Sequence, residues 1–331
     1  MSESSERKIK LLLLYEILRT QTDERHPITT KELSAALQKY GITVSRQTLY
    51  EDIEVLNRYG FDIVSEKGKR NRYYIDSHTF ERPEIEILLQ AVCSSNFLTE
   101  KKKTALLNKV SELFGTASAW EISELISDSP ADGKNEHIYY SIDAIMTALL
   151  EKKQITFRYY DYGLNGEKLY RRNGERYRVN PLGFIYSEGK LYFICYHDSH
   201  AEDGPTKYVA ERMDDVTAER ERITETAKYK DFDLSKYKRE LFSMYSGESR
   251  EISLIFPQEL LNVALERFGE TIKPIRYGNG EFLFTASIQV SNPFFGWIAS
   301  FGGRVRIHSP EEVKGQYKEF IKDLEKSLEK R

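Results

Sequence analysis

Tyrosines and arginines gather in the middle of this chain, where their chemistry suits a nucleotide or a single strand of nucleic acid. Half of the 22 tyrosines lie within residues 139–208, about a fifth of the sequence. On alternating strands, three pairs of such side chains would each share one face of a sheet. The pairs are Tyr192 with Tyr196, Arg176 with Arg178, and Tyr208 with Arg212. Rings stack on bases and guanidinium groups grip phosphates. Tyrosine is equally an ordinary half-buried residue of small barrels, and the residues alone favour neither explanation.

Near the N-terminus, one short helix carries residue types that read the edges of DNA bases. Ser45 can cap this helix, and Leu49, Ile53 and Leu56 recur along one apolar face until Gly60 ends it. Arginine and glutamine bind guanine and adenine in the major groove. The candidate base-reading residues flank the apolar face in the first turn and are Arg46, Gln47, Thr48 and Tyr50.

A basic hairpin follows this helix. Residues 61–64 and 72–75 read as strands on either side of a turn that contains Gly68. The cations at its tip are Lys67, Lys69, Arg70 and Arg72. A solvated turn is the simpler explanation for such a run. Its place directly after a capped third helix favours a wing that contacts DNA phosphates.

Few residues suit catalysis or metal binding. His197 and His200 have an H-x-x-H spacing, but no third ligand lies near them in the sequence. The sequence has no phosphate-binding P-loop, no dinucleotide fingerprint and no nucleophile elbow. We therefore expect no enzyme, no cofactor and no metal. An enzyme acting on nucleic acid is disfavoured because no carboxylate cluster can be placed.

The elements that must position these residues fall into four parts. In the first helix, over 7–21, the apolar positions are Ile9, Leu12, Leu13 and Ile17, and a second helix begins near Thr30. Further helices precede a polar, turn-rich linker at 127–134. The expected domains are a winged helix-turn-helix at 1–80, a helical connector and linker at 81–135, a small barrel or sandwich at 136–226, and a C-terminal domain at 227–331. Its β-α-β-β-α-β order predicts a ferredoxin-like sandwich, so the fold class is multidomain α+β.

Composition limits the functions that are possible. The 331 residues (38.7 kDa) carry a net charge of −3, so any nucleic-acid site must be local. Cys93 and Cys195 are too few for a disulfide scaffold or structural zinc. The longest aliphatic run, 11–14, is too short to cross a membrane. We expect a cytoplasmic protein without a membrane partner.

Taken in order, these motifs resemble bacterial transcriptional regulators with a winged helix-turn-helix, a central WYL domain and a C-terminal WCX extension. The stretches that carry the resemblance are 45–56 (SRQTLYEDIEVL), 177–183 (YRVNPLG), 189–193 (GKLYF), 208–213 (YVAERM) and 294–302 (FFGWIASFG). Two departures stand out. Leu191 replaces the family's usual tryptophan, and Gln47 and Glu51 stand where arginines are frequent.

The resemblance implies an Sm-like β-barrel that senses a nucleic-acid or nucleotide effector and relays the signal to the DNA-binding domain. By position, it assigns the effector site to Tyr159, Arg178, Tyr192, Tyr208 and Arg212, and alternation adds Arg176 beside Arg178. We expect a homodimer on a palindromic double-stranded operator. The alternative is a repressor that responds to a small metabolite.

Overall fold

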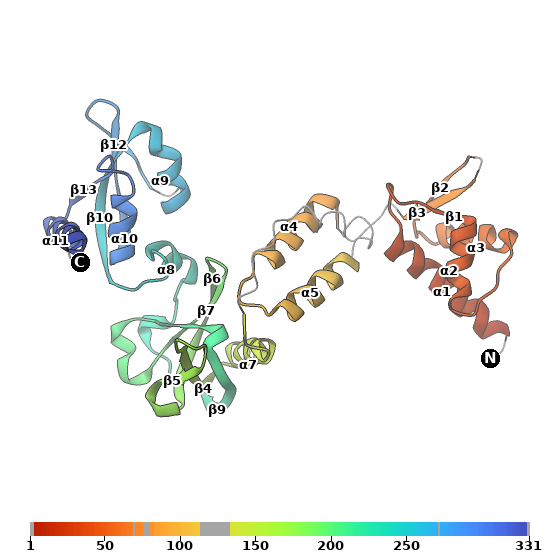
Figure 1. Ribbon diagram of the computed structural model, residues 1–331, viewed down its shortest axis with the longest axis horizontal. Coiled ribbons are helices and arrows are strands. Elements are labelled where there is room, and N and C mark those ends of the chain that lie inside the picture. The colour runs from red at the N-terminus through yellow and green to blue at the C-terminus, as the bar shows by residue number, and fades with distance from the viewer. Residues whose placement is uncertain (1–2, 69, 76–79, 113–132, 271, 330–331) are drawn as a thin grey trace. The chain divides into compact units, whose positions relative to one another are not determined.

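A computed structural model describes residues 3–68, 70–75, 80–112, 133–270 and 272–329. The chain divides into two compact units, Met1–Ile138 and Tyr139–Arg331, each of which is described by itself. Helices and curled antiparallel sheets give the mixed α+β class that the sequence predicts (Figure 1). None of the described helices is long and apolar enough to cross a membrane.

The N-terminal elements form a helix-turn-helix with a small sheet. They are α1 (Glu3–Gln21), β1 (Ile28–Thr29), α2 (Thr30–Gln38), α3 (Arg46–Arg58), β2 (Ile63–Glu66) and β3 (Arg72–Ile75), with strand order β1-β3-β2. Thr29 and Glu32 form a reciprocal capping box at α2, and the Ser45 hydroxyl accepts a hydrogen bond from the Thr48 amide at α3. Leu49 and Ile53 are buried in a core shared by all three helices.

The first helix buries only part of the expected face: Ile17 is buried and Leu13 packs against the core, but Ile9 and Leu12 do not. Leu14, Ile17 and Leu18 are buried, whereas Leu12 is 69% exposed and Ile9 lies at the surface. A run of four leucines satisfies several helical stripes equally well, so periodicity alone could not choose between them.

Two helices follow in the first unit: α4 (Arg82–Cys93) and α5 (Glu100–Glu112). They pack against each other around Ile85 and Leu89. The buried Lys103 ammonium donates to the Cys93 carbonyl at 2.9 Å, which ties the start of α5 to the end of α4. Most of the expected linker, residues 127–132, lies outside the described residues.

The second unit begins with a helix and a curled antiparallel sheet. The elements are α7 (Ile138–Glu151), β4 (Lys153–Tyr162), β5 (Lys168–Tyr170), η1 (Arg171–Gly174), β6 (Tyr177–Ser187), β7 (Lys190–Tyr196), η2 (Asp198–Asp203), β8 (Thr206–Val209), η3 (Ala210–Arg212) and β9 (Met213–Arg222). The strand order is β5-β4-β6-β7-β8, and β9 pairs with the long strand β4. A core on one face includes Phe157, Phe193 and Cys195.

The expected strand over 208–213 is broken. β8 ends at Val209, the 3-10 turn η3 holds Arg212, and β9 begins at Met213. Tyr208 and Arg212 therefore do not share a face by strand alternation. The strands β5 and β9 were not predicted, because β5 has only three residues and β9 is rich in charged residues.

A second cluster lies on the other face of β6 and β7. The next elements, η4 (Ala227–Tyr229) and α8 (Leu234–Glu240), lead into the C-terminal domain. Tyr192 and Ile194 pack with Tyr237 of α8. Gly183 has a φ of +152°, and a Cβ there would collide with the Leu234 side chain, so only glycine lets α8 pack this closely.

The C-terminal domain has the expected β-α-β-β-α-β order. Its elements are β10 (Glu248–Pro257), η5 (Gln258–Leu260), α9 (Leu261–Phe268), β11 (Ile275–Tyr277), β12 (Glu281–Val290), α10 (Asn292–Ala299), β13 (Arg306–Ser309) and α11 (Glu311–Glu329), with strand order β11-β12-β10-β13. Trp297 of α10 lies 5.0 to 6.1 Å, between ring centroids, from four phenylalanines. It is partly buried and packs against the core of this domain. The names Sm-like barrel and ferredoxin-like sandwich stay predictions.

Candidate functional site

The first turn of α3 presents the expected base-reading residues. Arg46, Gln47 and Tyr50 are exposed, and Thr48 is partly buried because its hydroxyl lies 2.9 Å from the Ser45 hydroxyl. Gln47 donates to the Glu51 carboxylate at 3.1 Å. The Ser45 cap thus fixes where the helix begins, and the exposed side chains around it are available to a ligand.

The helix is held in place at its middle and at its end. At its middle, the Lys10 ammonium of α1 pairs with the Asp52 carboxylate at 2.6 Å. Near its end, the Asn57 side chain donates to the Ile63 carbonyl at 2.8 Å and accepts from the Ile63 amide at 2.6 Å. The second pair of bonds links α3 to the first strand of the hairpin. No sequence pattern predicts this contact.

The hairpin tip is basic and hollowed. Lys67, Arg70 and Arg72 are exposed and line a shallow pocket of about 440 Å³ together with Glu66. Lys69 lies outside the described residues. Hydrogen bonds from Thr29 lower the pKa of Glu32 at the start of α2, and the charges of Arg70 and Arg72 add to this effect. The hairpin cations therefore act electrostatically on the helix-turn-helix itself.

In the second unit, a group of tyrosines forms the centre of a candidate effector site. Tyr159 of β4 and Tyr208 of β8 are 4% and 6% exposed, with ring centroids 4.9 Å apart. The Tyr159 hydroxyl accepts a hydrogen bond from the Val209 amide at 3.2 Å, which joins β4 to the end of β8. Tyr177 packs on Tyr208 at 5.4 Å. We call Tyr159, Tyr177 and Tyr208 the tyrosine cluster.

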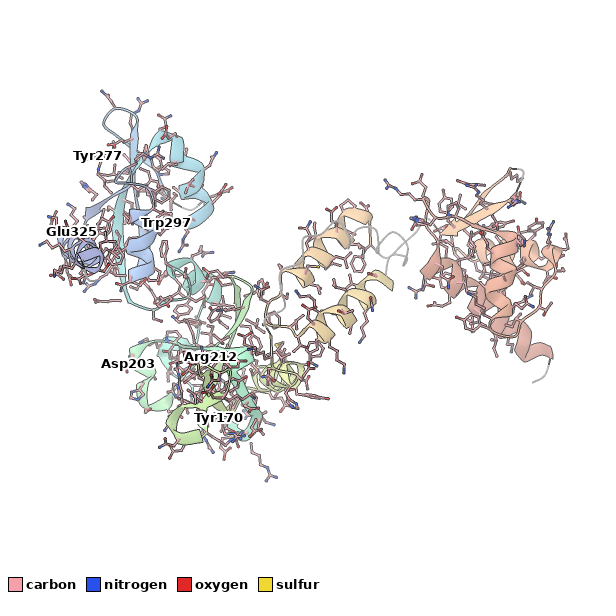
Figure 2. All side chains as sticks on the ribbon, viewed as in Figure 1. Tyr170, Asp203, Arg212, Tyr277, Trp297 and Glu325 are labelled. Atoms are coloured by element: carbon pink, nitrogen blue, oxygen red, sulfur yellow. The ribbon has the colours of Figure 1, made fainter. Side chains whose placement is uncertain are left out.

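Three arginines from two places in the sequence cover this cluster. The guanidinium carbons of Arg212 and Arg171 lie 4.9 and 5.2 Å from the Tyr159 ring centroid, and that of Arg172 lies 5.1 Å from the Tyr177 centroid. Figure 2 labels Arg212 and Tyr170 in the strand-rich part of the second unit. Cations over ring faces are attracted by the ring quadrupole. The buried rings thus form a floor beneath exposed positive charge.

His197 completes the cluster. Its Nε2 atom lies 2.9 Å from the Tyr208 hydroxyl, within hydrogen-bonding distance. Burial lowers the pKa of His197, and the nearby charges of His200 and Arg172 lower it further. Burial also raises the pKa of Tyr208. Both groups are therefore neutral at physiological pH, and the positive charge of the site comes from its arginines.

Three of the predicted effector residues lie elsewhere. Arg178 pairs with Glu221 at 3.9 Å on the opposite face of the sheet from Tyr177. Arg176 shares that opposite face, where it donates to the Thr156 hydroxyl at 2.9 Å. Tyr192 packs in the cluster beneath α8. The structure therefore brings together Tyr159, Tyr208 and Arg212 of the predicted set.

Sequence reasoning missed Arg171, Arg172 and Tyr177 as members of this group. The basic run that contains both arginines is visible in the sequence. The direction in which these two arginines point is not visible in the sequence. The backbone of η1 is left-handed at Arg172 (φ 53°) and Asn173 (φ 55°), which no strand or helix period predicts.

Comparison with protein families finds three known domains in this chain. An HTH domain is matched at residues 11–75, a WYL domain at 141–218 and a WCX domain at 248–324. The chain belongs to the WYL-domain helix-turn-helix regulators with a C-terminal WCX extension. The tyrosine cluster and its arginines all lie within the WYL domain, and α3 with the basic hairpin lies within the HTH domain.

Solved structures are similar over most of the chain. One is the proteasome accessory factor B/C (PafBC) of Arthrobacter aurescens, with 17% identity, a TM-score of 0.30, and coverage of 95% of this chain and 48% of that one. The chain therefore spans about half the length of PafBC. Another is a CRISPR Cas-related protein, with 15% identity, a TM-score of 0.37, and coverage of 98% and 85%. Comparison with curated proteins gave no match.

Proposed function

We propose that this protein is a cytoplasmic, non-enzymatic transcriptional regulator that binds a palindromic operator as a homodimer. Its WYL domain senses a single-stranded nucleic acid or a nucleotide, and the bound effector changes operator affinity. The HTH domain supports the DNA-binding half of this proposal. The observation that carries the sensing half is the pair of guanidinium groups over the buried Tyr159 ring, because guanidinium forks suit phosphates and aromatic rings suit bases.

Two arginines of similar exposure can test where the effector binds. Arg171 and Arg178 have side chains 52% and 53% exposed, and each pairs with a carboxylate, but only Arg171 lies over the tyrosine cluster. We expect Arg171→Gln to weaken binding about tenfold, the size of one charged hydrogen bond. Arg178→Gln should change it less than about twofold.

The measurement is fluorescence anisotropy of the full-length protein with short single-stranded DNA, RNA and mononucleotides at two salt concentrations. Binding through phosphates weakens as salt rises, because counterions are released. An equal loss of affinity in both variants would contradict a site at the tyrosine cluster, because Arg178 lies on the opposite face of the sheet. Absence of binding to every probe would remove nucleic acid as the signal.

A matched pair on α3 tests operator reading. Arg46→Ala should lower the ratio of operator affinity to random-DNA affinity by about ten- to a hundredfold, the range for one bidentate base contact. Arg58→Ala in the last turn, where the side chain pairs with Glu54, should leave the ratio unchanged. The operator is first selected from random duplexes. An unchanged ratio in Arg46→Ala would exclude that residue from base reading.

A pocket beside the WYL sheet favours a second candidate function, the sensing of a small metabolite. Its volume is about 580 Å³, and its lining includes Leu182, Tyr196, Ile223 and Tyr229. This size suits a small ligand, and the lining combines these apolar side chains with charged ones such as Lys152, Glu225 and Lys230. A thermal shift of the full-length protein with amino acids, nucleosides or sugar phosphates, without one for oligonucleotides, would favour this function.

A further inference from the structure

The arginines above the tyrosine cluster are already paired with a carboxylate of the protein. The Asp161 oxygens accept hydrogen bonds from Arg171 Nε at 2.6 Å and from Arg171 Nη2 at 3.1 Å, a two-pronged contact. The same carboxylate forms an ion pair with Arg212. Asp161 follows Tyr159 by two residues on β4, so both side chains lie on the same side of the strand.

The two arginines differ in how they are held. Arg212 also donates from Nε to the Tyr160 carbonyl at 3.0 Å, so it keeps an anchor that does not involve Asp161. Both side-chain hydrogen bonds found for Arg171 within the described residues go to Asp161. Because Arg171 is the first residue of η1, the Asp161 carboxylate fastens this turn to β4.

Carboxylate and phosphate are the two anions that fit a guanidinium fork. The Asp161 carboxylate therefore occupies the position where a ligand phosphate would meet both arginines above the Tyr159 ring. A phosphodiester carries one negative charge, the same as Asp161, and it must also displace a group that is tethered to the site. A terminal phosphate carries about −1.5 to −2 at neutral pH and would compete better.

We propose that Arg171 and Arg212 form a binding site for a terminal phosphate, and that Asp161 is its built-in competitor. This inference rests on the proposed effector-sensing function and names the part of the effector that is read. At rest, Asp161 holds the two arginines and closes η1 against β4. A terminal phosphate displaces the carboxylate, takes the two guanidinium groups and releases η1 from β4.

The test compares Asp161→Asn with Asp215→Asn in the full-length protein. Asp215 of β9 pairs with Arg158 of β4 at 2.5 Å. The control therefore makes the same change of charge in the same domain. The left-handed φ of 51° at Asp215 is tolerated by asparagine. The probe is fluorescein-labelled pentathymidylate, with or without a 5′-phosphate, measured by anisotropy.

We expect the wild-type protein to prefer the phosphorylated probe. Asp161→Asn should bind the phosphorylated probe about tenfold more tightly, and it should gain still more affinity for the unphosphorylated probe, so that the preference narrows. Asp215→Asn should behave like the wild type. Adding Arg171→Gln to Asp161→Asn should abolish the gain. If the Asp161 carboxylate had only a structural role, Asp161→Asn would instead weaken binding of the probes.

A second measurement is independent of nucleic acid. Inorganic pyrophosphate should raise the melting temperature of Asp161→Asn more than that of the wild type or Asp215→Asn. If the wild type binds pentathymidylate and Asp161→Asn binds it no more tightly, Asp161 is not a competitor, while the proposed function stands. If no form binds the oligonucleotide but pyrophosphate stabilises Asp161→Asn selectively, the phosphate site stands and nucleic-acid sensing fails. If neither the oligonucleotide nor pyrophosphate acts selectively on Asp161→Asn, the inference is overturned.

Discussion

At the residue scale, the same side-chain type has different roles according to what surrounds it. Arg171 and Arg212 cover Tyr159, whereas Arg176 bonds to Thr156 on the opposite face. Sequence alternation placed Arg176 and Arg178 correctly relative to each other. It could not show which face carries the tyrosine cluster, because strand period gives alternation without naming the buried side.

Lys207 provides a test of burial at this scale. Its ammonium hydrogen-bonds to the Ser246 hydroxyl near the Tyr237 ring, and burial lowers its pKa from 10.5 to about 8. Between pH 8 and 10.5 the unfolded chain therefore holds a proton that the folded chain has lost, so this group makes stability rise with pH. Relative to Lys207→Met, the wild type should gain free energy of unfolding from pH 7.5 to 9.5.

The measurement is urea denaturation of the full-length protein across that pH range. Lys190→Met, at an exposed lysine of β7, controls for the loss of one charge. Parallel curves for the wild type and Lys207→Met would contradict the lowered pKa.

At the element scale, local capping signals located the second and third helices of the helix-turn-helix. Thr29 and Ser45 fix the starts of α2 and α3 as the sequence predicts. Tertiary contacts decided what propensity could not. β9 forms because its charged strand pairs along β4, and η3 interrupts the expected strand where Arg212 reaches the Tyr160 carbonyl. The cluster arginines depend on these same unpredicted turns.

Asn57 tests how α3 and the hairpin are joined. Asn57→Ala leaves the Ile63 amide and carbonyl without their side-chain partner, which we expect to cost about 1–3 kcal/mol locally. Alanine is the better helix former, so the measured loss is a lower limit. Native-state hydrogen exchange of the Ile63 amide should accelerate. Glu54→Ala on the exposed side of the same helix should leave it unchanged, and equal rates in all three proteins would refute the link.

At the scale of the whole molecule, the residues proposed to read DNA and those proposed to sense the effector belong to different units. The α3 residues lie in Met1–Ile138, and the tyrosine cluster lies in Tyr139–Arg331. An effector can then change DNA binding only through a difference in its affinity for two states of the protein. The order of the domains was predictable from motif order. The domain limits at 1–80, 81–135, 136–226 and 227–331 stay predictions.

Linkage makes this coupling measurable. If a saturating effector changes operator affinity by some factor, saturating operator must change effector affinity by the same factor. We expect equal factors of about 5 to 150 from the two anisotropy titrations, the usual range for coupled sites. A factor of one in both titrations would show that the WYL site does not control DNA binding.

The aromatic surroundings of Trp297 give the protein an internal optical reporter. The chain has two tryptophans, Trp120 within Met1–Ile138 and Trp297 within Tyr139–Arg331. The Trp297 indole is packed among Phe242, Phe256, Phe268 and Phe301, so unfolding of the second unit moves it from an apolar environment into water. With Trp120 replaced by phenylalanine, Trp297 is the only tryptophan that emits. The melting of the second unit can then be followed in the intact chain without any attached dye.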